Sequence, residues 1–175
     1  MKRTLALAGA LIALLVLAIG CGGTAPTPVS KGAGKTVIQR TPTPVPATDE
    51  EAIRQIINAE CEAVVQQDID RLQGIWASDG VVTDANHTAD NTGDDVTWKG
   101  WDAIRDRYVN IVFPSSPTFC EHPGTLVTVS GTTATGSSGV KIGQTNCTDC
   151  NKWVFAKGAE GWKISTLTYN LNPQK

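Results

Sequence analysis

Glu60 is the residue of this sequence whose position most favours acid–base chemistry. Residues 49–67 carry apolar side chains with the spacing of an amphipathic helix, and Glu60 falls among Ile53, Ile57 and Val64 on the apolar stripe. Burial there would raise the pKa of the carboxyl group and suit it to act as a general acid or base. The helix therefore presents one candidate proton carrier to the interior of the domain.

A second interpretation of Glu60 needs no catalysis. A buried partner such as Arg105 or Tyr108 would hold the carboxylate, or the side chain would reach solvent past the end of the helix. We favour this structural interpretation, because buried carboxylates are normally paired or hydrogen-bonded.

Residues 84–95 form a polar stretch that is dense in oxygen ligands and contains His87. Oxygen ligands suit Ca²⁺, but the stretch lacks the Gly at position six and the Glu at position twelve of an EF-hand loop that begins at Asp84. We therefore expect a solvated loop and no metal site here.

Four cysteines follow residue 60, and their even number favours disulfides if the domain is exported. They are Cys61, Cys120, Cys147 and Cys150. Three connectivities are open, although residue 120 is expected to pair with about residue 143 in the sheet and so to lie near Cys147 and Cys150. An alternative is a structural zinc held by Cys120, His122, Cys147 and Cys150. Oxidation competes with it, so we expect neither a metal nor a cofactor.

Cys147 and Cys150 also form a C-x-x-C motif. A thioredoxin-like role requires a helix N-terminus that lowers the pKa of the thiol, whereas this motif is expected in a hairpin loop. We therefore do not favour a redox activity.

The N-terminus has the organisation of an export signal. Lys2 and Arg3 precede an uncharged, Leu-rich stretch that runs to Gly20. This stretch is shorter than a membrane-spanning helix requires. The residues before Cys21 resemble the lipobox of bacterial lipoproteins, which implies a signal peptide over residues 1–20 and a lipidated Cys21. An uncleaved anchor or an ordinary secretory signal are the alternatives. In each case the folded part lies outside the cytoplasm, and the resemblance predicts attachment to membrane lipid.

Residues 21–48 are rich in Pro and Thr and contain no aromatic residue. Such a segment buries too little apolar surface to offset its ordering entropy, and it is typical of an extended, disordered tether. The folded domain is therefore expected over residues 49–175.

Composition and missing motifs exclude several functions. With 15 basic and 17 acidic residues the formal net charge is −2, which gives no basic field for nucleic acid. The sequence contains no phosphate-binding Gly-rich loop, no G-x-S-x-G elbow and no H-E-x-x-H motif. Phosphoryl transfer, serine esterase and zinc protease chemistry are therefore not expected.

Three helices and six strands are expected to position the candidate residues. Thr48 and Glu51 form a capping-box pattern at the start of the first helix. The helices are predicted over residues 49–67, 68–77 and 101–111, the last one ended by Pro114. The strands are predicted over residues 81–83, 96–98, 125–130, 133–142, 151–157 and 162–171, the last four as an antiparallel meander.

This order of elements is similar to the nuclear-transport-factor-2-like superfamily, in its SnoaL-like or DUF4440-like branch. Three local motifs carry the resemblance over residues 49–172: WASDGVV at 76–82, WKGWDAI at 98–104 and EGWKI at 160–164. The resemblance implies an α+β fold, a cone-shaped α+β barrel in which three N-terminal helices pack in a strongly curved antiparallel sheet around an apolar pocket. The superfamily holds both enzymes and binding modules, so the fold alone does not decide the chemistry.

The pocket of such a cone would be lined by apolar and aromatic side chains. The candidates are Ile57, Val64, Trp76, Trp98, Tyr108, Trp153 and Phe155. Trp153 and Phe155 share a strand face and are expected opposite Thr166 and Ile164. Plain core packing is the interpretation that we favour for this pair, and an aromatic wall for a flat ligand is the alternative.

Three functions are consistent with these residues. We favour a non-catalytic module that binds a small apolar ligand or a protein partner. The alternative is an acid–base enzyme, an isomerase, dehydratase or hydrolase, with Glu60 and either Asp84 or His87 at the mouth of the cone as catalytic residues. A third hypothesis is a homodimer that associates through the open sheet.

Overall fold

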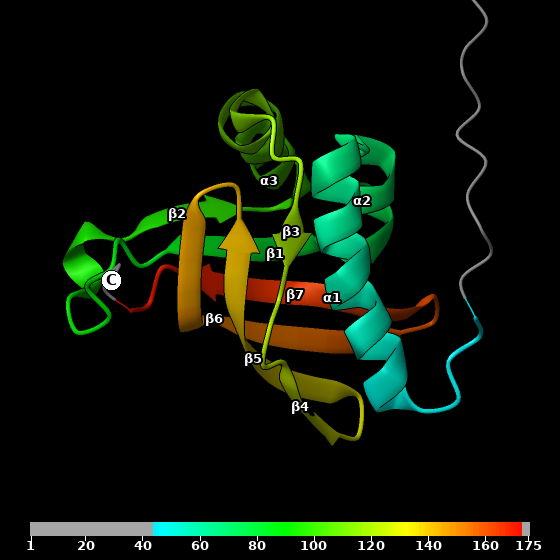
Figure 1. Ribbon diagram of the computed structural model, residues 1–175. Coiled ribbons are helices and arrows are strands. Elements are labelled where there is room, and N and C mark those ends of the chain that lie inside the picture. Colours follow the sequence, from blue (N-terminus) through cyan, green and yellow to red (C-terminus); the bar gives the residue numbers. More distant parts are fainter. Residues whose placement is uncertain (1–43, 173–175) are drawn as a thin grey trace, which may run out of the picture. The chain divides into compact units, whose positions relative to one another are not determined.

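The computed structural model describes residues 44–172 (Figure 1). The helices are α1 (Asp49–Gln66), α2 (Ile69–Ile75) and α3 (Trp101–Arg107), and the strands are β1 (Trp76–Asp84), β2 (Val96–Lys99), β3 (Cys120–Glu121), β4 (Leu126–Ser130), β5 (Thr133–Ile142), β6 (Thr145–Gly158) and β7 (Gly161–Tyr169). Cys21, the predicted signal peptide and nearly all of the predicted tether lie outside the described residues.

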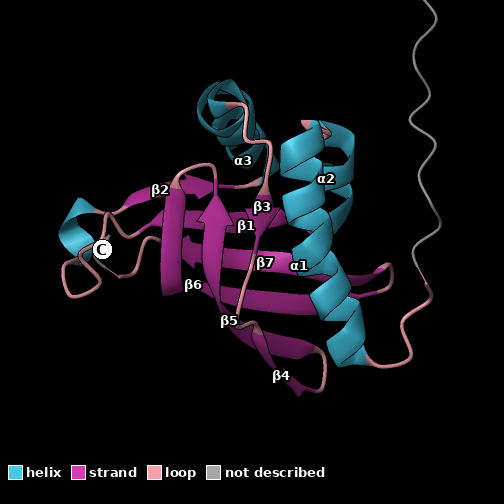
Figure 2. Ribbon diagram, in the orientation of Figure 1, coloured by secondary structure: helices cyan, strands magenta, loops and turns pink. Residues whose placement is uncertain are grey.

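The strands form one mixed sheet that curves without closing (Figure 2). Its order is β2-β1-β7-β6-β5-β3, with β4 paired to β5. The predicted antiparallel meander from β4 to β7 is confirmed, and so is the cone-shaped α+β fold with three helices. The sheet is not purely antiparallel, because β1 runs parallel to β7.

The start of α1 follows from local sequence. Thr48 Oγ1 accepts a hydrogen bond from the backbone N–H of Glu51 at 3.1 Å, and the Glu51 carboxylate reaches back to the N–H of Ala47 at 2.7 Å. The first contact satisfies an amide group that the first turn of a helix leaves unpaired, and the second holds the residue that precedes the cap. The helix then buries the apolar stripe that the sequence shows.

One predicted helix end is wrong by two residues, and another helix changes its geometry before its predicted end. The second helix ends at Ile75 instead of Ala77, because Trp76 already pairs with Ile164 as the first residue of β1. The third helix has α-helical geometry only to Arg107, and a π-helical turn over Tyr108–Val112 continues it. Single π-helical turns are rare and often occur at functional sites.

The β5–β6 hairpin differs most from its prediction. β6 begins at Thr145 and not at residue 151, so Cys147 and Cys150 lie within a strand rather than in a hairpin loop. The pairing shifts at Gly139, where an added Cβ atom would come within 2.6 Å of the Cys147 carbonyl oxygen. Only glycine allows the two backbones to approach so closely.

The β6–β7 register also differs by one residue from the prediction. Phe155 lies opposite Ile164 as expected, but Trp153 lies opposite Leu167 instead of Thr166. An irregularity between Val154 and Phe155 inserts the extra residue, which a pattern of alternation cannot show.

The hydrophobic core lies between the helices and the inner face of the sheet. Its largest fully buried side chains include Trp153, Tyr108, Phe155, Ile53 and Ile57. Within residues 44–172 we find no helix with the length and apolar character that a membrane crossing requires.

Candidate ligand-binding site

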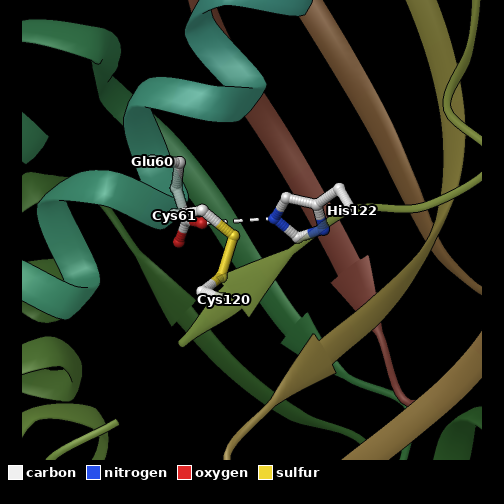
Figure 3. A group of neighbouring side chains, drawn as sticks. All are labelled: Glu60, Cys61, Cys120 and His122. Carbon is white, nitrogen blue, oxygen red and sulfur yellow. Dashed lines mark hydrogen bonds and ion pairs between the residues drawn. A yellow bond between two sulfur atoms is a disulfide. The ribbon is translucent and has the colours of Figure 1, made fainter. Parts of the chain in front are cut away.

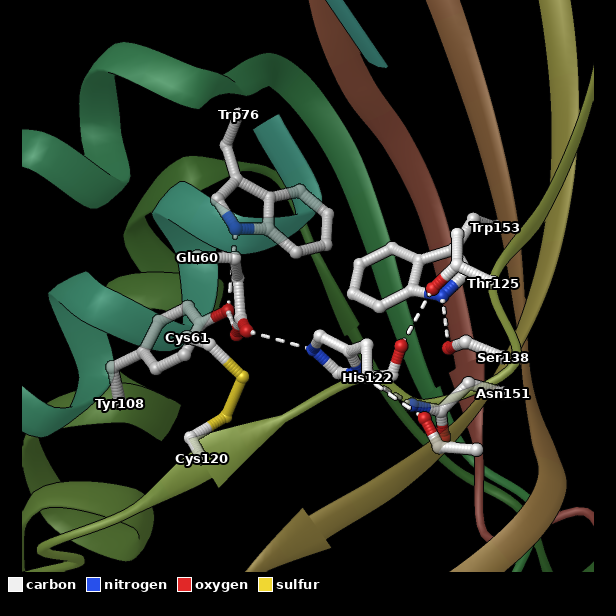
Figure 4. A network of polar contacts seen from close by, with 11 residues as sticks. Glu60, Cys61, Trp76, Tyr108, Cys120, His122, Thr125, Ser138, Asn151 and Trp153 are labelled. Atoms are coloured by element: carbon white, nitrogen blue, oxygen red, sulfur yellow. Dashed lines mark hydrogen bonds and ion pairs between the residues drawn. A yellow bond between two sulfur atoms is a disulfide. The ribbon is translucent and has the colours of Figure 1, made fainter. Parts of the chain in front are cut away.

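Glu60 lies on the buried face of α1 and is 6% exposed. Its Oε1 accepts a hydrogen bond from the Tyr108 hydroxyl at 2.7 Å, and its Oε2 lies 3.4 Å from Nε2 of His122 (Figure 4). Arg105, the other partner considered from sequence, is exposed and pairs with Asp106 at 2.9 Å. The carboxylate is therefore held by a phenol and an imidazole.

The network extends from Glu60 to the sheet (Figure 4). The Trp76 indole N–H donates to the Tyr108 hydroxyl at 3.2 Å. On the other side, Nδ1 of His122 lies 3.2 Å from the Gly139 carbonyl oxygen and 3.4 Å from the Asn151 side-chain nitrogen. A doubly protonated His122 would donate to Gly139 and to Glu60 at once.

His122 is the partner of Glu60 that sequence reasoning missed, since it entered there only as a zinc ligand. A signal was present, because His122 follows Cys120 by two residues. Had the Cys61–Cys120 pairing been known, the two-residue spacing would have placed His122 beside Glu60.

Burial and pairing act on the titration of this network in opposite directions. Burial raises the pKa of Glu60, but the hydrogen bond and charge of His122, the Tyr108 hydrogen bond and the charge of Arg107 together leave this pKa below its usual value. Burial and the Glu60 charge raise the pKa of Tyr108 well above its usual value. Glu60 is therefore ionised and Tyr108 protonated at neutral pH.

A disulfide between Cys61 and Cys120 joins α1 to β3 beside this network (Figure 3). Cys147 and Cys150 carry free, buried thiols, and burial with the neighbouring Cys147 raises the pKa of the Cys150 thiol to about 12. A thiol with so high a pKa is a poor nucleophile at neutral pH.

The side chains in Figure 3 bring four metal-ligating atoms within 4.8 Å of one another. They belong to Glu60, Cys61, Cys120 and His122, whereas the zinc set considered from sequence included Cys147 and Cys150. Zinc binds thiolates. With both sulfurs in a disulfide, only Glu60 and His122 of this group offer ligands.

A cavity of about 490 Å³ opens beside the network. This volume is in the range of roughly 300–1,000 Å³ that small-molecule sites occupy. Its lining includes Glu60, Tyr108, His122 and Asn151 together with apolar side chains such as Val64.

The predicted pocket-lining residues separate into two groups. Val64 and Tyr108 line this cavity. The others pack in or against the hydrophobic core: Ile57, Trp76, Trp98, Trp153 and Phe155.

Arg107, which no sequence pattern singled out, also lines the cavity. It is 9% exposed, and its guanidinium carbon lies 4.6 Å from the centre of the Tyr169 ring, 5.3 Å from Trp98 and 5.5 Å from Tyr108. Burial raises the pKa of Tyr169, while the charge and hydrogen bond of Arg107 oppose this rise. The three aromatic residues near Arg107 come from separate segments of the sequence. They would have pointed to this site only if the pairing of the strands had been known.

Asp84 and His87 lie away from the Glu60 network. Asp84 accepts hydrogen bonds from the Asn170 side chain at 2.8 Å and from the backbone of Asn86 at 2.9 Å. Nδ1 of His87 lies 2.7 Å from the backbone oxygen of Asn172. Neither residue belongs to the cavity lining, so the structure does not bring them together with Glu60.

The fold is that of a known class of proteins. The SnoaL-like domain family matches residues 46–168, and the chain belongs to this family. A search of curated proteins finds none that matches this chain.

Solved structures agree with this assignment. An NTF2-like protein with a cystatin-like fold from Novosphingobium aromaticivorans is 25% identical, with 69% of this chain and 79% of that chain covered and a TM-score of 0.51. An NTF2-like superfamily protein from Salmonella enterica is 16% identical, with coverage of 73% and 92% and a TM-score of 0.57. A second Novosphingobium aromaticivorans protein, whose proposed activity is aromatic ring hydroxylation, is 20% identical, with coverage of 75% and 95% and a TM-score of 0.56. The last two likenesses show the fold alone.

Proposed function

We propose that this protein is a lipid-anchored, extracytoplasmic binding module that holds a small, largely apolar ligand in the cavity of its SnoaL-like domain without converting it. The observation that carries this proposal is a cavity of about 490 Å³ whose Glu60 and His122 are already paired with protein groups.

The pairing disfavours proton transfer to a ligand. Glu60 uses one oxygen for Tyr108 and the other for His122, and both nitrogens of His122 face protein atoms. Hydrogen bonds to both oxygens stabilise the carboxylate and so reduce its tendency to take a proton from a ligand. The lowered pKa of Glu60 also makes it a weak base.

Binding of the neutral fluorescent probe N-phenyl-1-naphthylamine tests the cavity. We expect the probe to bind to the wild-type domain and Ile142→Trp to abolish binding, because Ile142 lines the cavity and the larger ring would fill it. Val129→Trp is the matched control, since Val129 packs against the core from β4 and is not part of the cavity lining. Equal binding by both variants would show that the probe does not occupy this cavity.

An acid–base enzyme, an isomerase, dehydratase or hydrolase, is the second candidate function. The observation that favours it is the 3.4 Å contact between two ionisable groups, Glu60 and His122, in one cavity. Its test is product analysis by mass spectrometry after incubation with compounds that displace the probe. Turnover that disappears in Glu60→Gln would replace the binding proposal with catalysis.

The anchor is tested in cells. We expect metabolic labelling with a radioactive fatty acid to mark the protein and Cys21→Ser to remove the label and release the domain from the membrane fraction. A membrane-bound but unlabelled wild-type protein would favour an uncleaved hydrophobic anchor. Labelling that persists in Cys21→Ser would place the lipid on another residue.

A homodimer through the sheet stays a prediction. Val154, 38% exposed on β6, is an apolar side chain available on the strand surface for such a contact. Light scattering of the wild type and of Val154→Glu measures the oligomeric state. A dimer that forms through this surface would dissociate in the variant.

A further inference from the structure

We propose that the ligand carries an anionic group, a carboxylate or a sulfonate, which pairs with Arg107 inside the cavity. This inference rests on the proposed function and adds the chemical class of the ligand to it. The expected ligand is therefore an amphipathic acid with an apolar body.

The first observation is a buried cation that forms no ion pair with the described residues. Arg107 is more than nine-tenths buried and lines the cavity. No carboxylate within residues 44–172 forms an ion pair with it, and its Nε is buried without a hydrogen-bond partner. Burying an unpaired charge is costly, so a site of this kind favours a counter-ion.

The second observation is that aromatic rings fix the guanidinium in place. Trp98 on β2, Tyr169 on β7 and Tyr108 lie within 5.5 Å of its central carbon, measured to the ring centres. These contacts stabilise the cation without using its N–H groups as salt-bridge donors. A planar guanidinium held in this way is suited to bind a carboxylate through two parallel hydrogen bonds.

The third observation concerns the other charges of the cavity lining. Glu60 is the carboxylate among the lining residues, but Tyr108 and His122 occupy its two oxygens. Glu60 forms no ion pair with the guanidinium, although the charge of Arg107 helps to lower its pKa, and His122 Nε2 lies 3.4 Å from its Oε2. The anionic group of a ligand is therefore directed to Arg107 and away from Glu60.

A fourth observation concerns Asn151, which is 2% exposed and lines the same cavity. Its side-chain oxygen is buried and has no hydrogen-bond partner among the described residues. Two unsatisfied polar groups of opposite character, the Arg107 donor and the Asn151 acceptor, thus belong to residues that line one cavity.

The test uses residues 22–175, because the described hydrophobic core lies wholly between Ala52 and Tyr169 and this chain keeps every described residue. The probes are 1-anilinonaphthalene-8-sulfonate, which is anionic, and N-phenyl-1-naphthylamine, which has the same rings without the sulfonate. We expect Arg107→Met to weaken binding of the anionic probe by about 10- to 100-fold, the value of a charge-assisted hydrogen bond, and to change the neutral probe by less than about 3-fold.

Arg105→Met is the matched control, because it removes the same charge from the same helix at an exposed position. It should leave the affinities of both probes unchanged, which separates a local contact from the effect of net charge. If the neutral probe binds and Arg107→Met leaves the anionic probe unaffected, the anion inference is overturned and the binding proposal stands. If neither probe binds to the wild type, both are overturned.

A second measurement needs no variant and covers the case in which Arg107→Met does not fold. Displacement of the neutral probe from the wild-type chain by 2-naphthoate is compared with displacement by 2-naphthamide, its uncharged isostere. We expect 2-naphthoate to displace the probe at a concentration at least about 10-fold lower. Equal or better displacement by 2-naphthamide would overturn the inference.

Discussion

At the residue scale, the polar interior of this domain is built around one ionised carboxylate. Glu60 would be unfavourable in an apolar interior by itself, and two hydrogen-bonding partners offset its desolvation. The same partners keep it from acting as a free acid or base. The residue that looked most catalytic in the sequence is therefore explained as the centre of a paired network.

Removing the Tyr108 hydroxyl should show how much the fold depends on the hydrogen bonds to Glu60. We expect Tyr108→Phe to lower the free energy of unfolding by about 2 kcal/mol, because the ionised Glu60 loses a hydrogen bond and the Trp76 indole N–H loses its acceptor. Urea denaturation at neutral pH measures the change. Tyr169→Phe is the comparison, since the Tyr169 hydroxyl interacts with Arg107 and Asp84 and not with Glu60. Equal losses in the two variants would contradict the special role of the Tyr108 hydroxyl.

Glu60 also gives the stability a pH dependence of known sign. Because its pKa is lowered in the folded state, ionised Glu60 stabilises the fold above its unfolded pKa, near 4.5, and this contribution is lost as the pH falls through the folded value. We therefore expect the wild type to exceed Glu60→Gln in stability at pH about 7 and the difference to shrink at pH about 3.

Denaturant titrations of both proteins across this pH range measure that difference. Exposed Glu62→Gln serves as the control, with a small effect at every pH, because its ion pair with Arg71 is 57% exposed on the Glu62 side. A difference for Glu60→Gln that widens as the pH falls would show a raised pKa and would make Glu60 a candidate acid again.

At the scale of elements, two irregular places carry the site. The π-helical turn at Tyr108–Val112 directly follows Arg107, and the register shift between β5 and β6 lies at Gly139. Gly139 offers its carbonyl oxygen to Nδ1 of His122, so the backbone irregularity also positions the histidine. Regular helix and strand would have placed these groups differently.

Gly139→Ala tests this element. The added methyl group would approach the Cys147 carbonyl oxygen at 2.6 Å and the Pro123 ring at 3.3 Å, so backbone must shift. We expect a loss of about 1–3 kcal/mol in the free energy of unfolding, measured by urea denaturation, and a displaced His122 imidazole resonance. Gly158→Ala is the control, because no atom lies within 4 Å of the position that its methyl group would take. A stability of Gly139→Ala equal to that of the control would show that the hairpin adapts freely.

At the scale of the whole domain, one cross-link joins the helical layer to the sheet. The Cys61–Cys120 disulfide connects α1 to β3 between residues that are 59 positions apart in the sequence. These are the elements that carry Glu60 and position His122. The integrity of the site and the stability of the domain therefore depend on the same bond.

Loss of this bond should be costly. For a loop of this length the chain-entropy relation gives about 4 kcal/mol, so we expect Cys61→Ala/Cys120→Ala to lower the free energy of unfolding by about that amount. Thermal or urea denaturation measures it. Cys147→Ala/Cys150→Ala removes no cross-link and should lower the free energy of unfolding by less.

Alkylation and mass spectrometry of unfolded residues 22–175 should find one disulfide and two free thiols, and any other pairing would contradict the structure.

Local patterns in the sequence predict the class of fold and much of the secondary structure. The capping pattern at Thr48, the stripe around Glu60 and the meander after residue 125 all follow from nearest-neighbour preferences and the periods of helix and strand. These signals are local, so they can be read without knowing which segments meet. The ends of the elements were less certain, because at Trp76 pairing with Ile164 overrode the helical pattern.

The site, in contrast, depends on contacts between segments that are distant in the sequence. Glu60 and His122 are separated by 62 residues in the sequence. Arg107, Tyr169 and Trp98 lie close together, although each belongs to a different helix or strand. The choice of Cys120 as the partner of Cys61, the parallel β1–β7 pairing and the Gly139 register shift bring these residues together. Contacts between distant segments depend on how the whole sheet curves and pairs, and that arrangement is a balance of packing energies over the entire domain that no local pattern contains.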